Sequence, residues 1–157
     1  MTALIGGPHH RLDETAVRAF VREQFDGLDL DGRSLCLVIP DATRACPLPM
    51  LLGAIDEAVT GRVRSCTAVV ALGTHAPMGE AARRALVGVD GLEVVNHEWW
   101  DDATFAAVGT LDAETVHRLS DGRLDEAVAV RVNRLVVESD VTVIVGPVLP
   151  HEVVGFS

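Results

Sequence analysis

Three short polar segments carry most of the side chains in this sequence that could perform chemistry. Residues 40–44 supply an aspartate, a threonine and an arginine, residues 73–78 supply a threonine and a histidine, and residues 146–152 supply a second histidine. An arginine suits a carboxylate or a phosphate because its donors form a planar fork. The two histidines, His75 and His151, can exchange protons near neutral pH. Together the segments could bind a small anion and move a proton on it.

Each polar segment directly follows a short apolar run. The runs are rich in Val, Ile and Leu and are bounded by turn residues, a pattern that is typical of buried strands. They cover residues 34–40, 66–72 and 141–145, and a further short run predicts a strand at residues 92–95.

Helical spacing of apolar residues separates these strands. Asp13 is the expected N-cap of a first helix that ends near Gly27, and further helices are expected at residues 47–59, 77–86 and 112–119. Residues 124–132 alternate enough for a strand or a hairpin arm. This order predicts an α/β fold with a mostly parallel sheet and helices on both faces, a Rossmann-like three-layer sandwich. Because ligands bind beyond the carboxyl ends of such strands, we expect the three polar segments to share one crevice.

The residue types leave several roles open. Asp41 could orient a hydroxyl group or pair with Arg44, and Thr43 and Thr74 could donate hydrogen bonds to a phosphate. Backbone N–H groups near Gly73 could also bind an anion. Against these roles, Asp41 or Thr43 could simply cap the next helix, and a histidine in a loop is often only solvated.

Composition excludes several classes of protein. The 157 residues suffice for one domain, and the net charge of −10 disfavours nucleic-acid binding. All 13 basic residues are arginine, so the chain cannot form a lysine Schiff base or a Walker-type phosphate loop. No apolar run is long enough for a membrane span, and no signal peptide is evident. Three cysteines suit a reducing, cytoplasmic location.

The remaining residues that could do chemistry are interpreted as structural. The other four histidines lack metal-ligand spacing with any cysteine, so no metal site is expected; they are His9, His10, His97 and His117. Trp99 and Trp100 could stack on a base, but we interpret them as a wall of the core.

Taken together, the polar segments resemble the N-terminal catalytic domain of the nickel-dependent lactate racemase family. The similar stretches are Asp-Ala-Thr-Arg at residues 41–44, Leu-Gly-Thr-His-Ala-Pro-Met at 72–78, and residues 146–157, with Val-Asn-His at 95–97 between them. The resemblance runs from about Gly7 to the last residue.

The resemblance implies a reaction and a set of site residues. Family members interconvert enantiomers or epimers of 2-hydroxy acids with a nickel-pincer nucleotide, a pyridinium thiocarboxylic acid mononucleotide that carries nickel. Hydride leaves the substrate's C2 and returns to either face, while two histidines on opposite sides take the hydroxyl proton; by motif match these are His75 and His151. The cofactor-binding residues implied in the same way are Asp41, Ala42, Thr43, Arg44, Gly73 and Thr74. Arg44 suits the cofactor phosphate and the substrate carboxylate equally.

In one respect the sequence departs from the family. Family members continue past the Gly-Phe-Ser stretch to a lysine that attaches the cofactor covalently and to a histidine that ligates nickel. This sequence ends at Ser157 and contains no lysine. We therefore expect residues 1–157 to form a single α/β domain, the N-terminal part of a two-domain racemase whose C-terminal portion is absent. Alone, it is expected to be inactive and not to retain the cofactor.

Two other functions remain open. The chain could be a truncated, non-catalytic module of the same fold that binds a nucleotide or an anion, or a non-racemase enzyme for another small acid. The expected partners are a small 2-hydroxy acid and the missing domain. A domain separated from its partner exposes apolar surface, so self-association into a homo-oligomer is a further expectation.

Overall fold

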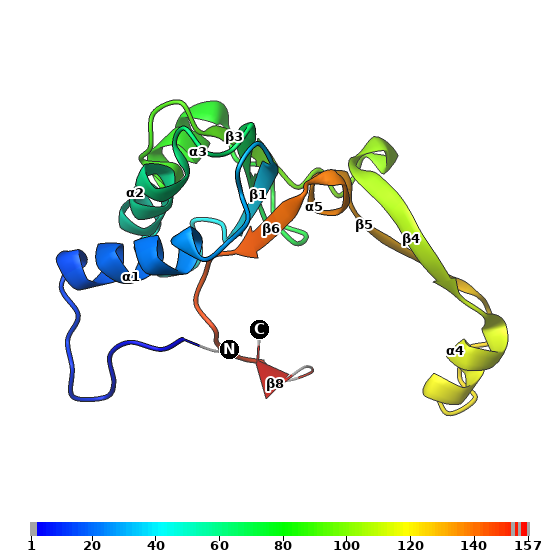
Figure 1. Cartoon of the computed structure of the whole chain (residues 1–157). Helices are drawn as coiled ribbons and strands as arrows, with labels where there is room; N and C mark the ends of the chain where they lie inside the picture. The colour runs from blue at the N-terminus through cyan, green and yellow to red at the C-terminus, as the bar shows by residue number, and fades with distance from the viewer. Residues whose placement is uncertain (1–2, 152, 154, 157) are drawn as a thin grey trace.

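The computed structural model describes residues 3–151, 153 and 155–156. At its centre lies a four-stranded parallel sheet with the strand order β3-β2-β1-β6 (Figure 1). Its strands are β1 (Ser34–Ile39), β2 (Ser65–Val70), β3 (Glu93–Asn96) and β6 (Val141–Ile144). The predicted α/β fold with a mostly parallel sheet flanked by helices is confirmed.

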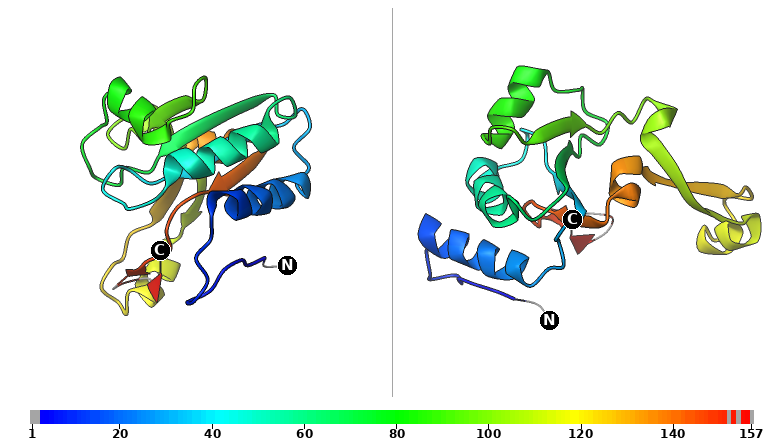
Figure 2. Two further views of the ribbon diagram at one scale, coloured as in Figure 1. Left: turned by 90° about the vertical axis from the view of Figure 1, so that its left-hand side faces the viewer. Right: turned by 45° about the horizontal axis from the view of Figure 1, so that its top comes forward.

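Three helices cover one face of this sheet. They are α1 (Glu14–Asp26), α2 (Leu48–Val59) and α3 (Glu80–Val87), which Figure 2 shows side by side. Leu35, Leu37 and Ile39 of β1 point toward them and are almost fully buried, because alternate residues of a strand face the same side. Asp13 caps α1 as predicted, accepting a hydrogen bond of 2.8 Å from the N–H of Ala16.

The opposite face of the sheet is covered more lightly. The short helix α5 (Arg134–Glu138) lies on this side, where the hydroxyl of Thr142 on β6 donates a 3.1 Å hydrogen bond to the carbonyl of Val136. Cys36 is fully buried there, whereas the side chain of Ile144 is 81% exposed. The sheet is therefore flanked on both sides, but only one side carries the main core.

A two-stranded antiparallel arm extends away from the sheet (Figures 1 and 2). It consists of β4 (Phe105–Leu111) and β5 (Val128–Asn133), with α4 (Ala113–Leu119) at its tip and a 3-10 turn, Asp102–Thr104, before it. We call residues 105–133 the arm. A second small hairpin, formed by β7 (Pro150–His151) and β8 (Gly155–Phe156), follows β6.

Two predictions from the sequence are wrong in detail. The third helix begins at Glu80 and not at Pro77, because residues 77–79 belong to the loop after β2. Trp99 and Trp100 do not form a wall of the core, since they are 44% and 47% exposed in the loop after β3. In the described part of the chain, no helix has the length and apolar character needed to cross a membrane.

Candidate functional site

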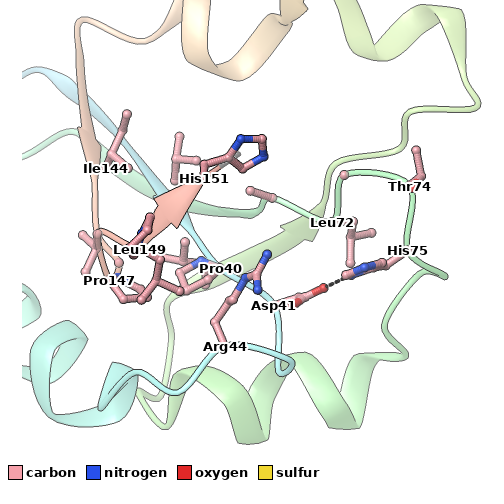
Figure 3. Close-up of a pocket in the computed structure, with 17 residues that line it drawn as sticks. Pro40, Asp41, Arg44, Leu72, Thr74, His75, Ile144, Pro147, Leu149 and His151 are labelled. Atoms are coloured by element: carbon pink, nitrogen blue, oxygen red, sulfur yellow. Dashed lines mark hydrogen bonds and ion pairs between the residues drawn. The ribbon is translucent and has the colours of Figure 1, made fainter. Parts of the chain in front are cut away.

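A cavity of about 600 Å³ opens at the carboxyl edge of the sheet (Figure 3). Its walls come from the segments that follow β1, β2 and β6, because parallel neighbouring strands end at the same edge. A volume of this size accommodates a small-molecule ligand. The side chains that could do chemistry in it are Asp41, Arg44, Thr74, His75 and His151.

Asp41 lies at the floor of the cavity and is only 6% exposed. One carboxylate oxygen, Oδ1, accepts hydrogen bonds from the hydroxyl of Thr43 at 2.5 Å and from its backbone N–H at 3.0 Å. The other oxygen, Oδ2, lies 2.5 Å from Nδ1 of His75. Both oxygens of a nearly buried carboxylate are thus hydrogen-bonded.

These contacts explain the ionisation of Asp41. Burial by itself raises the pKa of a carboxyl group, because it disfavours the charged form. The hydrogen bonds from His75 and from the hydroxyl and N–H of Thr43 outweigh that effect and hold the pKa of Asp41 below its usual value. Asp41 is therefore a carboxylate at neutral pH.

The carboxylate in turn fixes the tautomer of His75. Since Asp41 only accepts hydrogen bonds, Nδ1 of His75 must carry the proton that it donates. Nε2 of the neutral ring then keeps its lone pair. The side chain is 54% exposed and lines the cavity. The arrangement has the features of a general base that is oriented by a buried acid.

The backbone of the loop after β2 sets the position of His75. Its N–H donates a 3.0 Å hydrogen bond to the carbonyl of Leu72, which closes a tight turn. Gly73 lies inside this turn with a φ of +59°, a backbone conformation that residues other than glycine rarely adopt. The turn directs residues 73–75 toward the cavity.

Arg44 and Thr74 supply hydrogen-bond donors to the same cavity. The backbone N–H of Arg44 donates to the carbonyl of Asp41 at 3.2 Å, which folds the segment after β1 into a turn. The guanidinium group itself has no hydrogen bond or ion pair with another described residue. Its donors are free to bind an anion.

His151 reaches the cavity from β7. In Figure 3 its ring lies on a different side of the cavity from the ring of His75, and Arg44 lies below His151 and to the left of His75 in this view. Nδ1 of His151 accepts a hydrogen bond of 3.1 Å from the N–H of Val153. The structure therefore brings Arg44, His75 and His151 together from three distant parts of the chain.

The other residues singled out in the sequence lie as follows. Gly73 lines the cavity, Thr43 acts on it through Asp41, and Ala42 is exposed and does not line it. His97 accepts a hydrogen bond of 3.0 Å from the side-chain amide of Asn133 outside the cavity. The described residues contain no cluster of three or more His, Cys, Asp or Glu side chains that could hold a metal ion.

Sequence reasoning missed the apolar part of the cavity. Prolines and aliphatic side chains form much of its lining, and the signal for them was their position at or just after the ends of the strands. They are Pro40, Leu72, Ile144, Pro147, Leu149 and Pro150.

Open parallel sheets with a pocket at the carboxyl edge define a class of α/β domains that bind small molecules. Comparison with known families gives the finer assignment. The family model of the lactate racemase N-terminal domain matches residues 12–157. The chain belongs to this family.

A solved structure shares the fold. It is a protein from Thermotoga maritima, determined by a structural genomics consortium, and it superimposes with a TM-score of 0.84 at 25% sequence identity. The similarity covers 99% of this chain but 37% of that protein. A search of curated proteins finds no match.

Proposed function

We propose that this chain is the N-terminal catalytic domain of a cytoplasmic 2-hydroxy-acid racemase or epimerase of the lactate type. The observation that carries the proposal is the Asp41–His75 pair, 2.5 Å apart, in a cavity that also holds Arg44 and His151. A buried carboxylate behind one imidazole and a second imidazole across the cavity suit a reaction that moves protons on two faces of a small acid.

His75 takes the proton of the substrate's hydroxyl group on one face. Its Nε2 is the basic atom, because Nδ1–H is donated to Asp41. Asp41 holds the ring in place and stabilises the imidazolium that forms when Nε2 accepts a proton. Removing this proton makes the alcohol a better hydride donor, because the electron pair left on the oxygen forms the C=O bond as hydride leaves C2. We assign the same step for the opposite enantiomer to His151. Its Nδ1 lone pair accepts from the N–H of Val153 here, so this hydrogen bond must open before Nδ1 can take a proton.

The cavity fits one part of a nickel-pincer nucleotide. The free guanidinium of Arg44 would bind a phosphate or a carboxylate, and the hydroxyl of Thr74 and the turn at Gly73 line the same cavity. When bound, this cofactor would accept hydride from C2 of the substrate and return it. Because the chain has no lysine, a lysine that attached the cofactor covalently would lie outside these 157 residues.

A second domain completes the site in this proposal. Two apolar side chains at the cavity, Ile144 and Leu149, are 81% and 43% exposed, which supports a covering partner. This chain spans 37% of the matching protein from Thermotoga maritima, so that protein is long enough to contain a further domain.

The role of His75 is tested by His75→Asn in a longer protein that contains this domain and its loaded cofactor. We expect turnover to fall by about 100-fold or more in at least one direction, as for loss of a general base. His117→Asn is the matched control, because His117 also contacts a carboxylate, Asp125, at 2.5 Å, but on the exposed surface of the arm. Undiminished racemisation in both directions by the His75 variant would refute the proposal.

A binding module without chemistry is the second candidate function, and the free guanidinium of Arg44 favours it. Calorimetry of this chain with a pyridine mononucleotide should then give binding that Arg44→Ala weakens by about tenfold or more, as expected for a charged hydrogen bond. Arg84→Ala, which removes a surface arginine paired with Glu80, should leave binding unchanged. If calorimetry detects no heat of binding between the unmodified chain and the mononucleotide, this second candidate is wrong.

A further inference from the structure

The loop that carries His75 is supported from the side by the segment that follows β3. The indole N–H of Trp99 donates a hydrogen bond of 3.4 Å to the backbone carbonyl of His75. Trp99 lies 24 residues further along the chain, so the contact joins two separate loops. It acts on the backbone of the residue whose side chain reaches Asp41.

The segment after β3 is itself well anchored. The N–H of His97 donates to the carbonyl of Val70 at the end of β2, at 3.0 Å, and the N–H of Trp99 donates to the carbonyl of His97 at 2.9 Å. Trp100 packs against Trp99 edge to face, with ring centroids 5.7 Å apart. The indole of Trp99 is thus held on the frame of the sheet while it touches the loop.

The other end of the loop after β2 is held by the last residue of β3. Asn96, the last residue of β3, accepts a hydrogen bond of 3.3 Å from the N–H of Met78 and donates one of 3.0 Å to its carbonyl. Between these anchors, residues 73–77 are exposed to solvent. Trp99 therefore contacts this exposed loop at His75, the residue whose N–H is bound to Leu72 and whose side chain is bound to Asp41.

We propose that Trp99 is a positioning residue for His75: its indole N–H holds the His75 backbone so that the imidazole stays in contact with Asp41. This inference rests on the proposed function in so far as His75 acts as the base. Trp99 itself lies outside the lining of the cavity and takes no part in proton transfer. Removing its N–H should let the loop move and loosen the contact between His75 and Asp41.

The test compares Trp99→Phe with Trp100→Phe in this chain. The first removes the N–H donor and keeps an aromatic ring; the second removes a neighbouring indole for which the structure gives no hydrogen bond to the loop. The ring signals of His75, assigned with His75→Asn, are followed by NMR. We expect Trp99→Phe to shift and broaden them and Trp100→Phe to leave them in place. Backbone signals of β1 should stay unchanged in both variants, which shows that the fold is intact.

Equal effects of the two variants on His75, or no effect of either, would overturn the inference. In the loaded longer protein, Trp99→Phe should lower kcat by about tenfold with KM nearly unchanged, because misplacement of a base costs rate more than binding. If His75→Asn retains full turnover while Trp99→Phe still shifts the His75 signals, the contact holds and the proposed base is wrong. If His75→Asn abolishes turnover and the NMR signals are unmoved, only the role of Trp99 fails.

Discussion

At the scale of single residues, Asp41 is the charged side chain of the cavity that is stabilised by the most hydrogen bonds. It combines near-complete burial with donors on both oxygens, from Thr43 on one side and His75 on the other. Without these hydrogen bonds, burial would favour the protonated form of the carboxyl group, since burial penalises its charge. The same hydrogen bonds therefore serve stability and the orientation of His75.

The stability of the fold should depend on pH through Asp41. Its pKa is lower in the folded than in the unfolded chain, so the folded state binds this proton less readily. The stabilisation is present above pH of about 4 and is lost as pH falls through the lower, folded pKa. Asp41→Asn should cost about 1–3 kcal/mol of unfolding free energy at pH 5. The difference from the parent should shrink toward pH 2.

Urea denaturation between pH 5 and pH 2 measures this effect. Asp125→Asn is a suitable control because Asp125 also pairs with a histidine, but on the exposed surface, where such pairs contribute about 0–1 kcal/mol. A stability difference for Asp41→Asn that stays constant over this pH range would contradict the argument.

At the scale of elements, the packing of α3 against α2 depends on Gly88. This residue ends α3 with φ of +65°, and its N–H donates to the carbonyl of Arg84. A Cβ atom at this position would lie 2.8 Å from the Cβ of Pro49 in α2. Glycine is needed both for the backbone conformation and for the close approach of the two helices.

Gly88→Ala should destabilise the fold by about 2–4 kcal/mol, through the left-handed backbone and the clash with Pro49. Gly61→Ala separates the two causes, because Gly61 also has a positive φ, +79°, but no atom lies within 4 Å of the place that an added Cβ would occupy. That variant should lose about 1–2 kcal/mol. Chemical denaturation checks both, and equal losses would show that the contact with Pro49 costs nothing.

At the scale of the whole molecule, the arm leaves an apolar face uncovered. The strand pairing places Leu111 opposite Val128 and Gly109 opposite Val130, so these residues share one face. Leu111, Val128 and Val130 are 39%, 41% and 36% exposed. Two-stranded hairpins are only marginally stable alone, and uncovered apolar faces favour association.

We therefore expect this chain to self-associate as its concentration rises. Val130→Arg should weaken the association, whereas Ala129→Arg, on the other face of β5, should have little effect. Sedimentation velocity over a range of concentrations measures both variants against the parent. A parent chain that sediments as a monomer at every concentration would contradict this expectation.

Much of the fold could be predicted because the signals were local. The runs at residues 34–40 and 141–145 are short, apolar and bounded by turn residues, and they form β1 and β6. Asp13 caps α1 because a capping side chain needs only the next three residues. The sequence places the start of α3 at Pro77 because proline favours the first turn of a helix. In the structure residues 77–79 are held in the loop by Asn96, 18 residues away from Met78.

The sequence by itself determined the four strands of the parallel sheet and the segments that had to meet at its carboxyl edge, since apolar periodicity and turn residues act over short distances. The tertiary structure decided which contacts form there. The local sequence does not decide whether Asp41 caps a helix, pairs with Arg44 or contacts His75. The structure selects His75, which lies 34 residues further along the chain. Likewise the exposure of Trp99 and its contact with the His75 loop follow from how β3 lies beside β2. Side-chain partners across loops depend on the register of neighbouring strands, which no short stretch of sequence encodes.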